Sequence, residues 1–123
     1  MTTKRIVVTG IGASSPLGGT APESWTALMA GVSGARTLEH EWVEKYELPV
    51  TFAAEAIVRP EDVLPRPTAK RLDPASQFAL VAAMEAWEDA GAPAVDPERR
   101  GVGFATGIGR ARTRLAPWAT PRQ

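Results

Sequence analysis

Short apolar runs recur along this chain, and two of them end in the same four residues, Thr-Gly-Ile-Gly. Residues 5–9 hold the continuous β-branched run Ile6-Val7-Val8, which is typical of a strand covered on both faces. Residues 101–106 lead into the second Thr-Gly-Ile-Gly and predict another buried strand. A looser alternation over residues 50–58 predicts a third strand.

The strongest helix pattern covers residues 74–90, and the sequence marks both of its ends. Asp73 is placed as the N-cap, Pro74 at the first helical position and Gly91 just after the end. The helix is apolar nearly all round, apart from a thin polar edge at Glu85, Glu88 and Asp89. Such a helix is expected in the interior of a structure with more than two layers.

A second helix is predicted after residue 20 by the capping box of Thr20 and Glu23, with Pro22 in its first turn and Gly31 beyond its end. It carries one apolar stripe, formed by Trp25, Leu28 and Met29. Residues 12–19 are predicted as a loop and residues 32–49 as mostly loop. Three prolines make residues 59–71 an irregular, exposed connection.

The resulting order is strand, helix, strand, long helix, strand. This order indicates an α/β fold with a largely parallel sheet. A chain of 123 residues has room for one domain.

The charge balance and the length of the apolar runs exclude some classes of function. The chain has 14 basic and 14 acidic residues, and this balance argues against a nucleic-acid binder. No apolar run is long enough to cross a membrane, and no basic segment followed by an apolar one opens the chain, so a cytoplasmic protein is expected. The last acidic residue is Glu98, and the arginine-rich remainder is expected to be a solvated tail.

Candidate chemistry is sparse. There is no cysteine and one histidine, His40, which is expected at the surface between two glutamates. The sequence therefore predicts no catalytic residue and no metal site. The glycine pattern does not predict a cofactor either, because position 15 is a serine where G-x-G-x-x-G needs glycine. Ser14 and Ser15 are better explained by turn formation than by nucleophilic catalysis.

Four stretches nevertheless resemble one family in order and spacing: RIVVTGIGASSPLGG, ESWTALMAGVSG, AKRLDPASQFALVAAMEAWEDAG and GVGFATGIG. Together they look like the beginning of a beta-ketoacyl-[acyl-carrier-protein] synthase, most closely a type II condensing enzyme of fatty acid synthesis. The resemblance implies the N-terminal part of a thiolase-like, five-layered α-β-α-β-α fold, incomplete in this chain. It also implies an acyltransferase of lipid metabolism that elongates acyl chains by decarboxylative Claisen condensation.

The resemblance further implies several site residues. Ile108 matches an isoleucine that lines the acyl pocket, and a basic surface for an acidic acyl carrier protein falls on Arg66, Lys70 and Arg71. The intact family forms homodimers. Its glycine turns lie near the catalytic centre and the dimer interface, and here they contain Gly10, Gly12, Gly107 and Gly109.

The sequence also departs from the family pattern. The family's catalytic cysteine and two histidines have no counterpart, so the resemblance leaves open whether this chain is an enzyme. Arg110 replaces a glycine, and we divide the chain into a partial synthase domain at residues 1–109 and a divergent tail at 110–123. The tail is expected to come from a frameshifted or truncated product, and such a chain is expected to aggregate or to be partly molten. The alternative is a non-catalytic interaction module, similar to a chain-length factor of polyketide synthesis.

Overall fold

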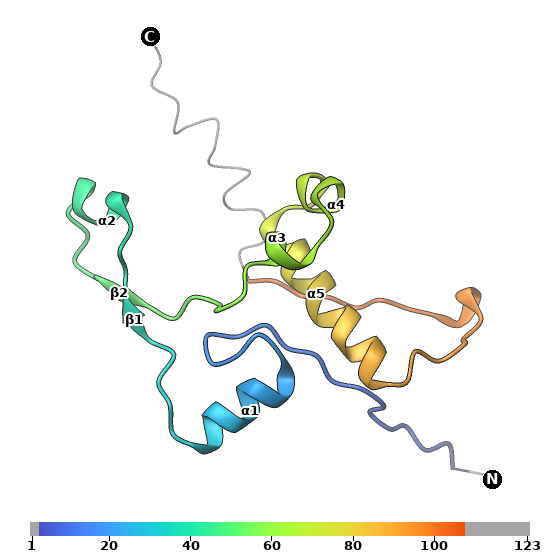
Figure 1. Ribbon diagram of the computed structural model, residues 1–123. Coiled ribbons are helices and arrows are strands. Elements are labelled where there is room, and N and C mark those ends of the chain that lie inside the picture. Colours follow the sequence, from blue (N-terminus) through green and yellow to red (C-terminus); the bar gives the residue numbers. More distant parts are fainter. Residues whose placement is uncertain (1–2, 108–123) are drawn as a thin grey trace. The chain divides into compact units, whose positions relative to one another are not determined.

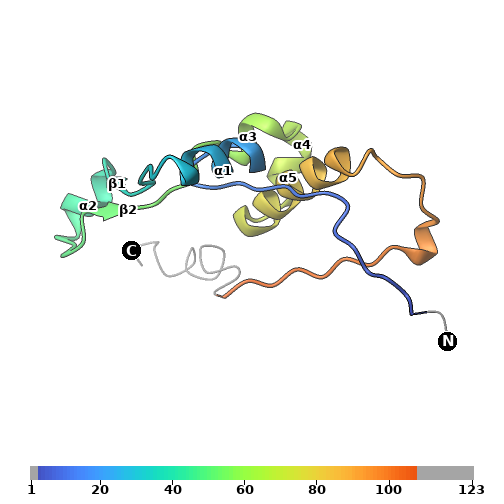
Figure 2. The ribbon, with the colours of Figure 1, turned by 90° about the horizontal axis from the view of Figure 1, so that it is seen from below.

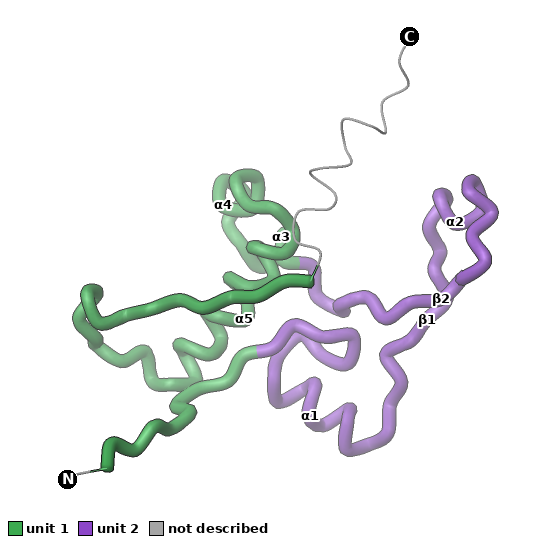
Figure 3. The backbone as a smooth tube through the Cα atoms, turned by 180° about the vertical axis from the view of Figure 1, so that it is seen from behind, with its two compact units in different colours: residues 1–12, 60–123 green, residues 13–59 purple. Residues whose placement is uncertain are grey.

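The computed structural model describes residues 3–107 and separates into two units, which Figure 3 colours differently. The first unit comprises Met1–Gly12 and Pro60–Gln123, and the second comprises Ala13–Arg59.

The first unit is built on helices. Its longest helix is α5 (Pro74–Asp89), and the short helices α3 (Pro60–Val63) and α4 (Arg66–Arg71) precede it. A single 3₁₀ turn, η1 (Pro97–Arg99), follows α5. Helix α3 contacts both α4 and α5, and Figure 1 shows the two short helices beside the N-terminal end of α5.

The predicted start of α5 is confirmed. The Asp73 side chain accepts a hydrogen bond from the backbone N–H of Ser76, and Pro74 is the first helical residue. Pro74 costs the helix no hydrogen bond, because the first N–H groups of a helix have no partner within it.

The predicted end of α5 is confirmed as well. Gly91 has a φ of 78°, a left-handed conformation that favours glycine. The N–H of Gly91 donates to Glu88 O and that of Ala92 donates to Trp87 O, and together these bonds close the helix end as a Schellman motif does.

The prediction for residues 59–71 is wrong in part. The segment is not one long helix, as expected, but it forms α3 and α4 instead of an irregular, exposed connection. Pro60 is the first residue of α3 and Pro67 lies in the first turn of α4, where a missing N–H costs no helical hydrogen bond. Leu64 and Ala69 are buried, so this segment supplies part of the core.

The second unit contains α1 (Ala21–Met29), β1 (Arg36–Thr37), α2 (Glu41–Lys45) and β2 (Phe52–Ala53). The two strands are antiparallel, with Arg36 opposite Ala53 and Thr37 opposite Phe52. Residues 32–49 therefore hold a strand and a helix where mostly loop was predicted. The strand predicted over residues 50–58 is reduced to β2.

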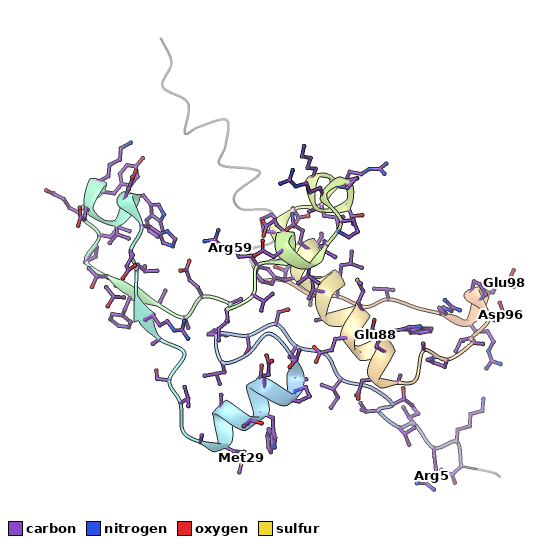
Figure 4. The ribbon with its side chains drawn as sticks, in the orientation of Figure 1. Arg5, Met29, Arg59, Glu88, Asp96 and Glu98 are labelled. Atoms are coloured by element: carbon purple, nitrogen blue, oxygen red, sulfur yellow. The ribbon has the colours of Figure 1, made fainter. Side chains whose placement is uncertain are left out.

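Helix α1 has its predicted caps. Thr20 accepts from the N–H of Glu23, as the capping box predicts. The Glu23 carboxylate accepts from the N–H of Gly19, one residue before the N-cap, where the box predicts the N–H of Thr20. Gly31 follows the C-cap with a φ of 70°. The predicted apolar stripe is exposed, however, and Met29 marks the end of this helix in Figure 4.

The two buried strands predicted at residues 5–9 and 101–106 do not form. Both segments lack a strand assignment and are exposed, with Ile6 and Val102 each 97% accessible. Figure 2 shows the later segment as an extended trace. Residues 3–107 contain only the β1–β2 sheet, so no parallel sheet exists within them. An extended segment needs a neighbouring strand for its backbone hydrogen bonds, and no described strand pairs with either segment.

The core of the first unit lies where α3 and α4 meet the first half of α5. Its buried residues include Leu64, Ala69 and Gln77, and Val43 is buried in the second unit. Within the part of the chain that the structure describes, no helix has the length and apolar content needed to cross a membrane.

Candidate functional site

Helix α4 brings together the three basic residues that the sequence singled out. Arg66 is its first residue, and Lys70 and Arg71 are its last two. All three side chains are exposed, and none forms an ion pair with another described residue. Arg66 and Lys70 are four positions apart and share one face of the helix. We call these three residues the basic surface.

The dipole of α4 favours two of the three positive charges and opposes the third. Lys70 and Arg71 lie in the last turn of α4, where a positive charge complements the helix dipole. Arg66 lies in the first turn, where the dipole opposes it. The stability of α4 therefore gives no reason for the charge at Arg66.

Buried contacts hold α4 in place beneath its exposed cations. Ala69 is buried on α4, and Leu64 is buried just before it. The Gln77 side-chain amide donates to Ala69 O at 2.8 Å and to Leu72 O at 3.0 Å. These bonds connect the C-terminal end of α4 to α5.

The first Thr-Gly-Ile-Gly lies directly on the backbone of α5. A Cβ atom added at Gly10 would come within 2.7 Å of Ala90 N, and one added at Gly12 within 2.7 Å of Ala86 N. Any larger residue would force the segment away from the helix, because backbone atoms cannot yield as a flexible side chain can. The close approach explains why both positions are glycine.

The residue between these glycines anchors the turn to the same helix. The N–H of Ile11 donates to the Asp89 carboxylate at 2.9 Å. Asp89 is the last residue of α5, so the turn lies along the flank of the helix toward its C-terminal end. Its geometry therefore differs from that of a phosphate-binding turn, which lies at a helix N-terminus.

The second Thr-Gly-Ile-Gly, unlike the first, shows no close contact at its first glycine. Gly107 is exposed, and a Cβ atom added there would meet nothing within 4 Å. Ile108 and Gly109 lie outside the described residues. The predicted acyl-pocket residue therefore has no described surroundings.

Ser15 has the turn role expected from the sequence. Its hydroxyl accepts from the N–H of Leu17 at 3.0 Å and from that of Gly18 at 3.1 Å. It is also 2.7 Å from the Ser24 hydroxyl. These bonds order the loop before α1.

His40 is partly exposed, and its partner is distant in sequence. Its Nε2 lies 3.0 Å from the Glu55 carboxylate, and its ring stacks on Trp42 with 5.1 Å between the centroids. The sequence suggested only its neighbouring glutamates. A contact across 15 residues has no local sequence signal.

The exposed side of α5 carries a shallow apolar hollow of about 310 Å³, lined by Leu80, Ala83, Met84, Trp87 and Glu88. Glu88 is labelled on this helix in Figure 4. The Arg100 guanidinium lies 5.0 Å from the Trp87 ring centroid and bonds to Val95 O, so Arg100 is not a free surface cation. The hollow lies on a single helix and has no convergent polar groups of the kind that orient a small ligand.

Sequence reasoning missed the two side chains that fasten other segments to α5, namely Gln77 and Asp89. The sequence predicts Asp89 only as part of a thin polar edge, whereas in the structure its carboxylate accepts from the N–H of Ile11. Gln77 offered one usable signal, because it is an uncharged polar residue within an almost wholly apolar helix. Such a residue, once buried, needs hydrogen-bond partners.

Known proteins resemble this chain along most of its length. A family profile described as "Beta-ketoacyl synthase, N-terminal domain" matches residues 3–120. The chain is 34% identical over 106 residues to the 3-oxoacyl-[acyl-carrier-protein] synthase 2 of Mycobacterium tuberculosis (strain ATCC 25618 / H37Rv), a match that covers 86% of this chain and 25% of that protein. It is 37% identical over 112 residues to the protein of the same name from Coxiella burnetii, covering 89% and 26% of the two chains. The chain thus spans about a quarter of the length of the curated relatives it matches.

Proposed function

The chain belongs to the beta-ketoacyl synthase family, and on this premise we propose that it is the carrier-docking N-terminal part of a condensing enzyme. Family membership implies a thiolase-like fold, and the five-layered α-β-α-β-α arrangement is part of the proposal. The partner is an acyl carrier protein, which is acidic, and the proposed setting is cytoplasmic fatty acid synthesis. The intact synthase is proposed to be a homodimer.

The observation that carries this proposal is the basic surface on α4. Three cations are exposed on one short helix, and none is neutralised by another described residue. The buried residues below them fix the helix on α5. A fixed group of unpaired cations attracts and orients an acidic partner, chiefly by increasing the association rate.

Catalysis is proposed to need residues outside this chain. Condensation in the family starts when a cysteine takes the acyl group from its carrier, and these 123 residues contain no cysteine. We therefore expect the chain alone to bind carrier protein without forming a condensation product from acyl-carrier and malonyl-carrier proteins. Product formation by the purified chain would overturn this part of the proposal.

The docking proposal is tested by fluorescence anisotropy with a labelled acyl carrier protein. Reversing the basic surface with Arg66→Glu, Lys70→Glu and Arg71→Glu should weaken binding by roughly tenfold or more, and mostly through the association rate. Raising the ionic strength should weaken binding to the unsubstituted chain and change little for the variant.

A matched control reverses three other exposed arginines, with Arg5→Glu, Arg59→Glu and Arg99→Glu. It makes the same change in net charge at positions outside α4, and Figure 4 labels two of these positions, Arg5 and Arg59. Docking at α4 predicts a much smaller loss for this control. Equal losses for both triple variants would show attraction by net charge alone and would contradict the proposed surface.

Ile108 is proposed to line the acyl pocket of the intact enzyme, next to the glycine turn of Gly107 and Gly109. The synthase part is proposed to end at residue 109, with residues 110–123 not needed for docking. In a full-length synthase that contains this segment, Ile108→Trp should weaken binding of a carrier loaded with a long acyl chain and leave binding of the unloaded carrier unchanged. Equal effects on both carriers would argue against a role in the pocket.

A further inference from the structure

We propose that Gln77 is a positioning residue for the basic surface, because it fastens the C-terminal end of α4 to α5. This inference rests on the proposed docking function for its biological meaning. The attachment of α4 to α5 can be measured on the chain alone, without carrier protein.

The geometry of the attachment is specific. Gln77 is only 6% exposed, and its amide nitrogen bonds to Ala69 O at 2.8 Å and to Leu72 O at 3.0 Å. Both acceptors belong to the end of α4, where Leu72 is the C-cap. The last carbonyl groups of a helix lack the donors that a further turn would supply. Ala69 O also accepts from the N–H of Leu72 at 3.3 Å, so Gln77 adds a second and shorter bond there and a side-chain donor to Leu72 O.

Helix α4 is too short to persist without contacts to other elements, which are α3 and, through Gln77, α5. It contains six residues, and its N-cap, Pro65, makes no side-chain capping bond. Helices this short do not persist without tertiary contacts. The three basic side chains are exposed, so they add little packing. Buried Ala69 and the two Gln77 bonds connect α5 to the end of α4 where Lys70 and Arg71 lie.

The choice of residue supports the same conclusion. An apolar side chain would be expected at a buried position on α5, and burying an amide is unfavourable unless it is hydrogen-bonded. Within the described residues, the Gln77 Oε1 atom has no hydrogen-bond partner. The donor side of the amide is thus the part that the structure uses.

The first test measures hydrogen exchange along the free 123-residue chain. Gln77→Met removes the donors at similar side-chain length, and Gln77→Leu removes them with a shorter, branched side chain. Both variants should raise the exchange rate of the Lys70 and Arg71 amides by roughly tenfold, with the middle of α5 unchanged. The control Met84→Gln makes the opposite substitution on the exposed side of α5 and should leave α4 unchanged.

The second test measures carrier binding in a double-mutant cycle. Gln77→Met should weaken binding several-fold although it changes no charge, and it should have no further effect once Arg66, Lys70 and Arg71 have been replaced by glutamate. Additive losses would show that Gln77 does not act through the basic surface.

The outcomes separate the two proposals. If the unsubstituted chain does not bind carrier protein, the docking function is wrong. The hydrogen exchange of the α4 amides still shows, without carrier protein, whether Gln77 attaches α4 to α5. If neither Gln77 variant increases that exchange, or if only one of them does, the donor role is overturned. Loss of protection throughout α5 would also overturn it, because Gln77 would then be a general stability residue.

Discussion

Three parts of the chain are rich in apolar residues: helix α5 and the segments at residues 5–9 and 101–106. The first is a helix with packed contacts, and the other two are extended and exposed. Helix α5 has two capped ends, and its first half contacts α3 and bonds to α4 through Gln77. The extended segments are exposed and belong to no described sheet. A helix closes its backbone hydrogen bonds within one segment, whereas a strand depends on a neighbour. Helix α5 can therefore form its backbone bonds within its own residues, whereas the extended segments need a neighbouring strand that residues 3–107 do not supply.

The largest expected effect comes from removing the packing that distinguishes the helical region. Leu64 is 5% exposed, and Leu64→Ala should lower the free energy of unfolding by about 2–5 kcal/mol because it leaves a cavity. Urea unfolding followed by circular dichroism measures this loss. Val63→Ala is the control, since the neighbouring Val63 is 48% exposed and should cost much less. Equal losses would mean that the core described around Leu64 is not formed.

The next largest loss of stability is expected at a glycine that lies against α5, and a glycine in an extended segment is its control. Gly12→Val should destabilise the chain by about 1–3 kcal/mol, because the new side chain would collide with the backbone at Ala82 and Ala86. Gly103→Val is the matched control, since an added Cβ meets nothing there within 4 Å. The same urea titration applies to both. A harmless Gly12→Val would show that residues 10–12 do not lie on α5.

A smaller loss in the free energy of unfolding is expected at the N-cap of α5. Asp73→Ala removes the side-chain acceptor at the start of α5 and should cost about 1 kcal/mol in the same urea titration. Asp96 accepts an equivalent bond from the N–H of Glu98 at η1, and Figure 4 labels Asp96 and Glu98. Asp96→Ala should leave the unfolding midpoint of α5 unchanged. A loss as large as that of Asp73→Ala would show that η1 and α5 unfold together.

The smallest effect is expected in the extended segments. Val102→Lys should change the free energy of unfolding by less than about 0.5 kcal/mol, because the side chain is already exposed. It should also slow aggregation, which light scattering measures, because a charge interrupts an unpaired apolar strand. A loss of stability comparable to that of Leu64→Ala would mean that residues 101–106 are packed.

The elements predicted correctly from the sequence are those whose determinants are local. The ends of α5 and α1 follow from Asp73, Gly91, Thr20 and Gly31, each of which acts within one turn of the helix it bounds. The sequence also predicts the exposure of the three cations, although it predicts an irregular connection where the structure has α4. The family assignment followed from four motifs and is confirmed by the profile match.

The failures concern contacts between distant segments. Strands were predicted at residues 5–9 and 101–106, but β-branched composition does not provide a neighbour to pair with. Helices α3 and α4 were missed, because prolines that suggested an irregular connection instead lie in the first turns of these helices. Gln77 and Asp89 looked like ordinary polar residues until their partners on other segments were located.

The sequence by itself thus determined the caps, the long helix, the family and the identity of the cations on α4. Tertiary structure decided which apolar segments are covered, where the glycines of the first turn are required and which side chain fastens α4. The reason is physical, because capping and helix formation are local interactions, whereas burial, close backbone approach and amide-to-carbonyl bonds depend on residues brought together from afar.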